Sequence, residues 1–269
     1  MRQRAWVLIP RQATRNVMGA SGSDAPGSAE AELEQPAMAR RIAWWKAGRW
    51  QHVRVRVEPV SVEGVVTHVV ERVLARGGRT DRPADGARPV RLLVDGHPST
   101  RPEALADALV EPLRAAGRPV ARVRVRDFLR ARSLRLERGR RDPDALLEEW
   151  IDVDGLDREV LRSVVTRGRW LPSLRDPDTG RSTRAAYEDA APGTVVVLDG
   201  SLALGRGLDV DLAVHLALRA ATETRNTPLD DAWTLAAYGR YRREVQPERR
   251  ADVVVRVDHP ERPALVLPD

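Results

Sequence analysis

The chain of 269 residues contains no cysteine. A protein without cysteine has no disulfide, no thiolate ligand for zinc and no cysteine nucleophile. Long hydrophobic runs are missing as well, since none approaches the roughly 20 residues that a membrane-spanning helix needs. The apolar stretch at residues 5–9 is also shorter than the core of a signal peptide, which has at least about 7 residues. We therefore expect a cytoplasmic protein with no membrane partner.

Lysine and asparagine are nearly absent. Lys and Arg together number 45, yet Lys46 is the one lysine, and Asn16 and Asn226 are the only asparagines. This usage is typical of a GC-rich genome, which favours Arg, Ala, Gly, Pro and Val. The pI near 10.6 therefore reflects the high pKa of arginine and a formal net charge of +6 more than a nucleic-acid partner, which we do not expect.

The N-terminal third divides into two parts by composition. Residues 1–37 are rich in Gly, Ser, Ala and Glu, and we predict that they form a disordered extension. Translation can begin at Met1, Met18 or Met38. Residues 38–87 are expected to form a strand and a helix that pack on the core. The tryptophans at 44, 45 and 50 lie among basic residues, so they either cover the edge of the domain or stack on nucleic acid, the latter being the weaker alternative.

Residues 88–269 alternate between strand and helix patterns. The strands are predicted at residues 90–96, 119–128, 193–200, 211–218 and 251–259, and the helices at 102–116, 143–150, 154–166 and 229–245. This alternation predicts an α/β domain: an open parallel sheet of about five strands with helices on both faces. The apolar run at 193–200 is predicted to be the most central strand. The strictly alternating run at 119–128 is predicted to lie near an edge.

Ligands of such sheets bind beyond the carboxyl ends of the strands. After the first strand comes VDGHPSTRPEALADAL, residues 94–109, which has the frame of a phosphate-binding loop. Together with VRVRDFLRARSLRLERGRRDPDAL, VVVLDG and ERRADVVVR, this segment resembles the uridine kinase-like branch of the P-loop kinases, in an actinobacterial style. The resemblance extends from about residue 88 to 267. It implies a nucleoside kinase that uses ATP and Mg²⁺ on a nucleoside or nucleotide.

The phosphate loop departs from the family motif GxxxxGK[ST]. Only its first glycine, Gly96, is present, while Arg101, Pro102 and Glu103 stand in place of the second glycine, the lysine and the hydroxyl residue. The chain's only lysine lies upstream of the fold, so no shift of the alignment restores the motif. Thr100 and Arg101 could still contact a phosphate at the helix N-terminus, and Glu103 could hold Mg²⁺ directly. The alternative is a plain connection from strand to helix.

Two acids follow later strands. The resemblance places the nucleoside's general base at position 126, where this chain has arginine, and Asp127 lies one residue later. Asp199 ends a strand where the Walker B acid would stand and could meet Mg²⁺ through water. The alternatives are that Asp127 pairs with neighbouring arginines and that Asp199 has a structural role.

Other candidate groups fit structural roles. Acids between 142 and 157 stand at helix starts, His215 lies in an apolar strand, and no spacing indicates a protein metal site. Five arginines of the expected lid could approach phosphates or face solvent: Arg219, Arg225, Arg240, Arg242 and Arg243.

Two functions remain. The first is a uridine kinase-like protein with a degenerate loop and weak or no catalysis. The alternative is an active nucleoside or small-molecule kinase whose phosphate site has been rebuilt.

Overall fold

The structure is a computed structural model that describes residues 55–77 and 87–268. The predicted disordered extension and the tryptophan-rich segment lie outside these residues. The compact unit that carries the sheet runs from Val57 to Leu267, and the account below concerns that unit.

Seven strands form the main sheet, in the order β1-β9-β8-β7-β2-β6-β3. They are β1 (Val55–Pro59), β2 (Val90–Gly96), β3 (Val120–Arg124), β6 (Val195–Gly200), β7 (Leu212–Ala217), β8 (Val253–Arg256) and β9 (Ala264–Pro268). The contiguous strands β3, β6, β2, β7 and β8 are all parallel, and β9 joins β8 antiparallel. The predicted parallel sheet of about five strands is thus confirmed, with two further strands on one side.

The structure differs from the prediction in two details, the end of the strand at 119–128 and the place of β6 in the sheet. The prediction that residues 119–128 lie at an edge is confirmed, but this strand ends at Arg124 and continues as a 3₁₀ turn, η2 (Val125–Phe128). The apolar strand β6 is not the most central one, since it stands between β2 and the edge strand β3. Its apolar sequence follows from helices that cover both of its faces, because burial on two faces removes the alternation of polar residues.

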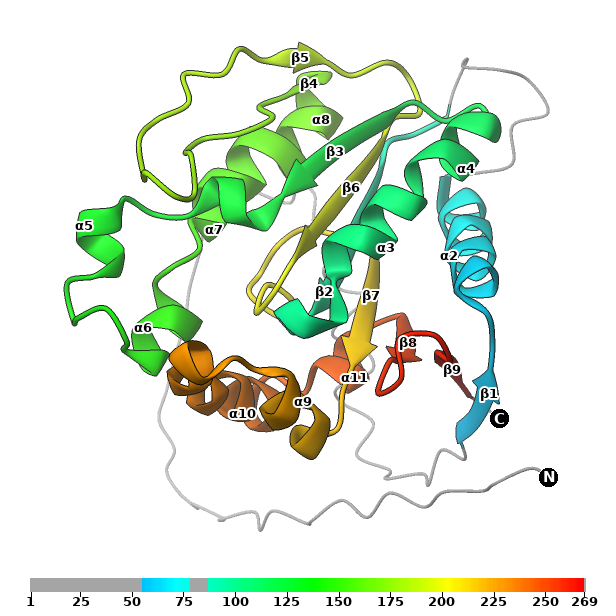
Figure 1. Cartoon of the computed structure of the whole chain (residues 1–269). Coiled ribbons are helices and arrows are strands. Elements are labelled where there is room, and N and C mark those ends of the chain that lie inside the picture. Colours follow the sequence, from blue (N-terminus) through cyan, green and yellow to red (C-terminus); the bar gives the residue numbers. More distant parts are fainter. Residues whose placement is uncertain (1–54, 78–86, 269) are drawn as a thin grey trace, which may run out of the picture. The chain divides into compact units, whose positions relative to one another are not determined.

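Helices connect the strands and cover both faces of the sheet (Figure 1). They are α2 (Val62–Gly77), α3 (Pro102–Ala108), α4 (Val110–Ala115), α5 (Arg132–Arg135), α6 (Pro143–Glu148), α7 (Val153–Leu156), the π-helical η3 (Asp157–Leu161), α8 (Arg162–Thr166), α9 (Ala220–Asn226), α10 (Leu235–Glu244) and α11 (Pro247–Arg250). Two short 3₁₀ segments, η1 (Pro98–Thr100) and η4 (Leu229–Thr234), precede α3 and α10, and a small antiparallel pair, β4 (Arg169–Trp170) with β5 (Glu188–Asp189), lies apart from the main sheet. The predicted helix at 102–116 is divided into α3 and α4, because Pro112 has no N–H to donate to the carbonyl of residue 108.

Neighbouring side chains of a strand enter two separate cores, as expected from the pleat. Leu92 joins α2, α3 and α4 in one cluster, whereas Leu93 joins α7, η3, α8 and α10 in the other. Val69 of α2 and Leu113 of α4 are fully buried in the first cluster. Burial of these apolar side chains on both faces fixes the sheet and therefore the positions of its strand ends.

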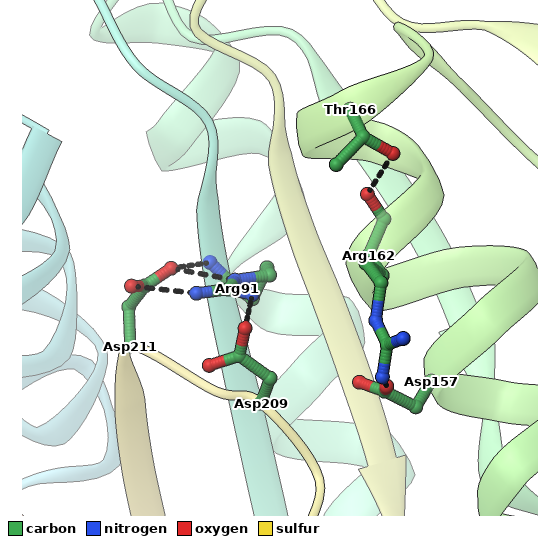
Figure 2. A network of polar contacts seen from close by, with 6 residues as sticks. All are labelled: Arg91, Asp157, Arg162, Thr166, Asp209 and Asp211. Carbon is green, nitrogen blue, oxygen red and sulfur yellow. Dashed lines mark hydrogen bonds and ion pairs between the residues drawn. The ribbon is translucent and has the colours of Figure 1, made fainter. Parts of the chain in front are cut away.

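An arginine fixes the opposite end of the sheet (Figure 2). Arg91, at the start of β2, bonds through Nε and Nη2 to Asp211 at 2.9 and 3.1 Å and through Nη1 to Asp209 at 2.5 Å. Asp211 also accepts a bond from the Arg91 backbone N–H. The same view shows Arg162 of α8 paired with Asp157 of η3. The cluster around Arg91 lies at the amino ends of β2 and β7, away from the carboxyl ends of the strands, and is structural.

Candidate active site

The connection after β2 is the predicted phosphate loop, and its backbone is bonded to itself. The N–H groups of Thr100 and Arg101 donate to the carbonyls of His97 and Pro98 at 2.8 and 3.0 Å. The N–H of Ser99 donates to Nδ1 of His97 at 3.2 Å, and prolines 98 and 102 have no N–H. Residues 98–102 therefore offer no free backbone N–H to a phosphate, which is the group by which such loops bind anions.

Gly96 and Thr100 are packed against each other. A Cβ built on Gly96 would lie 2.5 Å from Oγ1 of Thr100 and 3.0 Å from Cβ of Leu216. The Thr100 hydroxyl donates to the His97 carbonyl at 2.7 Å. The glycine is thus needed for close packing inside the loop, and the hydroxyl is already engaged.

Arg101 and Glu103 lie at the surface where α3 begins. Arg101 has φ of 55°, a left-handed conformation that is uncommon for a residue other than glycine. Its Nε lies 3.9 Å from Oε1 of Glu103, and both side chains are largely exposed. An exposed pair at this distance contributes little stability, so the positive charge of Arg101 is available to a ligand.

Asp199, at the end of β6, is held by an arginine of the neighbouring strand. Nη1 of Arg122 donates to its Oδ1 at 2.5 Å, and Nε of Arg122 binds Asp107 of α3 at 2.8 Å. Asp199 is buried, and burial raises the pKa of its carboxyl while Arg122 opposes that shift. The carboxylate predicted to face Mg²⁺ is therefore already neutralised by a guanidinium.

Asp127 lies on η2, next to the end of β6 along the sheet edge. It is half-buried, burial raises the pKa of its carboxyl, and Asp199 adds to the rise. Its backbone carbonyl accepts bonds from the N–H groups of Leu174 and Arg175 at 3.0 and 2.9 Å. The structure thus brings Asp127, Asp199 and the segment at 172–181 to the same end of the sheet.

Asp95 is a site residue that the sequence analysis did not single out. It is fully buried at the end of β2. Its Oδ1 accepts from the N–H of Ala203 at 3.0 Å, and its Oδ2 lies 2.9 Å from Nδ1 of His215 and accepts from Oη of Tyr241 at 3.0 Å. A buried carboxylate with this many donors holds four segments together. His215 is confirmed as a core histidine.

His97 lies between the loop and the helices that follow β7. Its Nδ1 accepts from Ser99, so Nε2 carries the proton and faces Oγ1 of Thr227 at 3.4 Å. The ring packs edge-on against Tyr238 of α10, with centroids 4.4 Å apart. Burial, followed by the charge of Arg242, lowers the pKa of His97 to about 4. A neutral histidine thus joins the loop to α9 and α10.

Three of the five lid arginines have carboxylate partners. Arg219 binds Asp258 at 3.0 Å, Arg242 binds the buried Glu223, and Arg240 binds three acids, among them Glu244 at 2.8 Å. Pairing within the protein explains their positions without a bound phosphate.

The predicted absence of a protein metal site stays a prediction. Asp142 and Asp152 cap helices, accepting from the N–H groups of Ala145 and Gly155 at 2.8 and 2.9 Å. Residues 55–77 and 87–268 contain no group of three or more His, Asp or Glu side chains placed to hold a metal ion.

Within the same ranges, no helix is long and apolar enough to cross a membrane.

Comparisons with known proteins add a fold but no family. No protein-family model matches the chain, and no curated protein matches it. Among solved structures, a possible uridine kinase from Bacillus stearothermophilus superposes with a TM-score of 0.55 at 19% identity, over 70% of this chain and 96% of that one. The fold is that of the P-loop kinases. The YGR205w protein superposes with a TM-score of 0.50 at 9% identity, over 78% of this chain and 99% of the other. At these identities the likeness extends to the fold alone.

Proposed function

We propose that this chain is a cytoplasmic uridine kinase-like protein that has kept the fold of a nucleoside kinase and lost effective phosphoryl transfer. The observation that carries the proposal is the phosphate loop: residues 98–102 have no free backbone N–H, and a proline stands at the lysine position. Phosphoryl transfer depends on positioning and on neutralisation of charge. A loop without these backbone donors and without the lysine contributes little to the reaction.

The residues of the loop do not fit ATP with Mg²⁺. The Thr100 hydroxyl is bonded within the loop, Glu103 would add negative charge beside a triphosphate, and Asp199 is paired with Arg122. Retention of a nucleoside or nucleotide as a bound ligand is compatible with this arrangement, because binding can outlast catalysis.

The alternative is an active nucleoside or small-molecule kinase with a rebuilt phosphate site. Asp127 and Asp199 support this alternative, because Asp199 stands at the end of β6, Asp127 follows the adjacent β3, and the pKa of each carboxyl is raised by burial. A raised pKa is a frequent property of acids that transfer protons. In such an enzyme Asp127 would accept the proton of a hydroxyl substrate, and the exposed Arg101 would meet a phosphate.

A phosphorylation assay separates the two functions. The purified chain is incubated with Mg²⁺·ATP and either uridine or cytidine, and nucleoside monophosphate is measured. We expect a rate at least 100-fold below one per second, since loss of one electrostatic contact of this kind typically costs about 100- to 1000-fold. Turnover near one per second that Asp127→Asn abolishes would instead establish the alternative.

A further inference from the structure

A cavity of about 350 Å³ lies beside α5, apart from the phosphate loop. Residues of three segments line it: Arg132, Arg135 and Arg140 from α5 and the turn after it, Trp150 after α6, and Pro177 with Asp178 from the segment that contacts Asp127. It is an open hollow at the surface, so a ligand would be held by its charged lining and not by enclosure. None of these residues belongs to the loop at 96–103.

Arg135 is a buried cation without a counter-charge. Its side chain donates from Nε to the carbonyl of Arg130 at 3.0 Å, and its guanidinium lies 5.2 Å from the centre of the Trp150 ring. No carboxylate lies within 4.0 Å of it in the part of the chain that the structure describes. Burial, and then the neighbouring charge of Arg132, lowers the pKa of Arg135. A buried charge is costly unless a partner of opposite charge accompanies it.

Among the described residues, Arg118 and Arg135 are the buried arginines, and Arg135 is the one that lines this cavity. Arg91 and Arg122 each bind two carboxylates. Arg118, which is also buried, has no carboxylate but donates to two backbone carbonyls, at 2.7 and 3.0 Å, and lines neither this cavity nor the smaller one beside Arg219. Arg135 has one such carbonyl and faces a cavity.

The rest of the lining is suited to an anion. Arg132 and Arg140 are exposed, and Nε1 of Trp150 is buried without a hydrogen-bond partner among the described residues. Asp178 is the one acid of the lining, and it lies 3.4 Å from Arg126. Three guanidinium groups against one carboxylate leave a formal charge of +2, which matches a phosphate monoester, whose charge near pH 7 is about −1.5 to −2.

We propose that this cavity binds the phosphate monoester of a small hydroxylated molecule, such as a sugar phosphate or a nucleoside monophosphate. Arg132, Arg135 and Arg140 bind the phosphate, since guanidinium forks match its oxygens in bidentate geometry. Asp178 accepts a hydrogen bond from a hydroxyl of the ligand. Binding at this cavity does not depend on whether the loop after β2 binds ATP.

Titration calorimetry with ribose 5-phosphate, ribose and inorganic phosphate tests the proposal, in 150 mM NaCl without ATP or Mg²⁺. We expect ribose 5-phosphate to bind at least tenfold more tightly than ribose, with inorganic phosphate between them. Arg132→Ala and Arg140→Ala each remove one exposed guanidinium and should weaken ribose 5-phosphate about tenfold, as loss of a charged hydrogen bond does.

The matched control is Arg138→Ala, which removes the same charge from the same turn. Arg138 binds Glu149 at 2.8 Å and does not line the cavity, so we expect an affinity within twofold of the wild type. The proposal is overturned if ribose 5-phosphate binds no more tightly than ribose. It is also overturned if Arg138→Ala weakens binding as much as the cavity variants, because the effect would then be general electrostatic attraction.

Discussion

At the scale of single residues, the neutral ring of His97 contacts Ser99 of the loop after β2, Thr227 next to α9 and Tyr238 of α10. Its folded-state pKa of about 4 lies below the value of about 6.5 for an unfolded chain. The unfolded state therefore binds more protons between these values, and stability is lost as the pH falls through that window.

Substitution of His97 should make the protein less sensitive to acid. In wild-type protein this group should lower the free energy of unfolding by about 2 kcal/mol between pH 7.5 and pH 5. His97→Asn keeps an acceptor for the Ser99 N–H and does not titrate, so that share of the loss should vanish. Urea unfolding of both proteins at the two pH values measures it. An equal loss in the two proteins would show that His97 does not carry the effect.

Residue roles could be predicted from the sequence only where a motif position fixes them. The replacement of the motif lysine by Pro102 is visible in the sequence alone, whereas the bonds of the Ser99, Thr100 and Arg101 N–H groups within the loop are visible only in the structure. The Asp95 network is not visible, because its partners Ala203, His215 and Tyr241 lie more than 100 residues away. The pairing of Asp199 with Arg122 was likewise hidden, since it depends on the alignment of β3 against β6.

At the scale of elements, the bonds of Arg91, at the start of β2, to Asp211 and Asp209 should contribute to the stability of the sheet. Asp211→Ala would leave Arg91, whose side chain is 11% exposed, without its main partner. We expect a loss of about 2 to 3 kcal/mol in the free energy of unfolding, measured by chemical denaturation. Asp209→Ala is the matched control: Asp209 is 61% exposed, and its loss should cost less than about 1 kcal/mol. Similar losses of unfolding free energy in both variants would contradict the claim that Asp211 is the main partner of Arg91.

Most elements could be predicted because their apolar residues follow a regular pattern. The buried strands β2, β6 and β7 are predicted by short apolar runs bounded by turn residues, and α2 lies in the segment 38–87, where a strand and a helix are expected. The order of the strands could not be deduced from apolarity, since helices on both faces make β6 as apolar as a central strand. The break between α3 and α4 depends on Pro112.

At the scale of the whole molecule, the fold is kinase-like, whereas residues 98–102 of the loop after β2 have no free backbone N–H. The parallel sheet and the helices on its faces match P-loop kinase structures, yet the loop that defines their chemistry is closed by its own hydrogen bonds. A fold supports many functions, and the side chains at the strand ends decide which one operates. Our central claim is that this loop does not bind ATP productively.

Titration of Mg²⁺·ATP by calorimetry, on the wild type and on a variant with the motif restored, tests that claim most directly. Arg101→Gly, Pro102→Lys and Glu103→Thr together rebuild GxxxxGKT from Gly96, and Pro102→Ala is the control that removes the ring without adding charge. We predict no binding, or binding weaker than about 1 mM, in the wild type and the control, and affinity at least tenfold higher in the restored variant. Micromolar binding of Mg²⁺·ATP by the wild type would contradict the account.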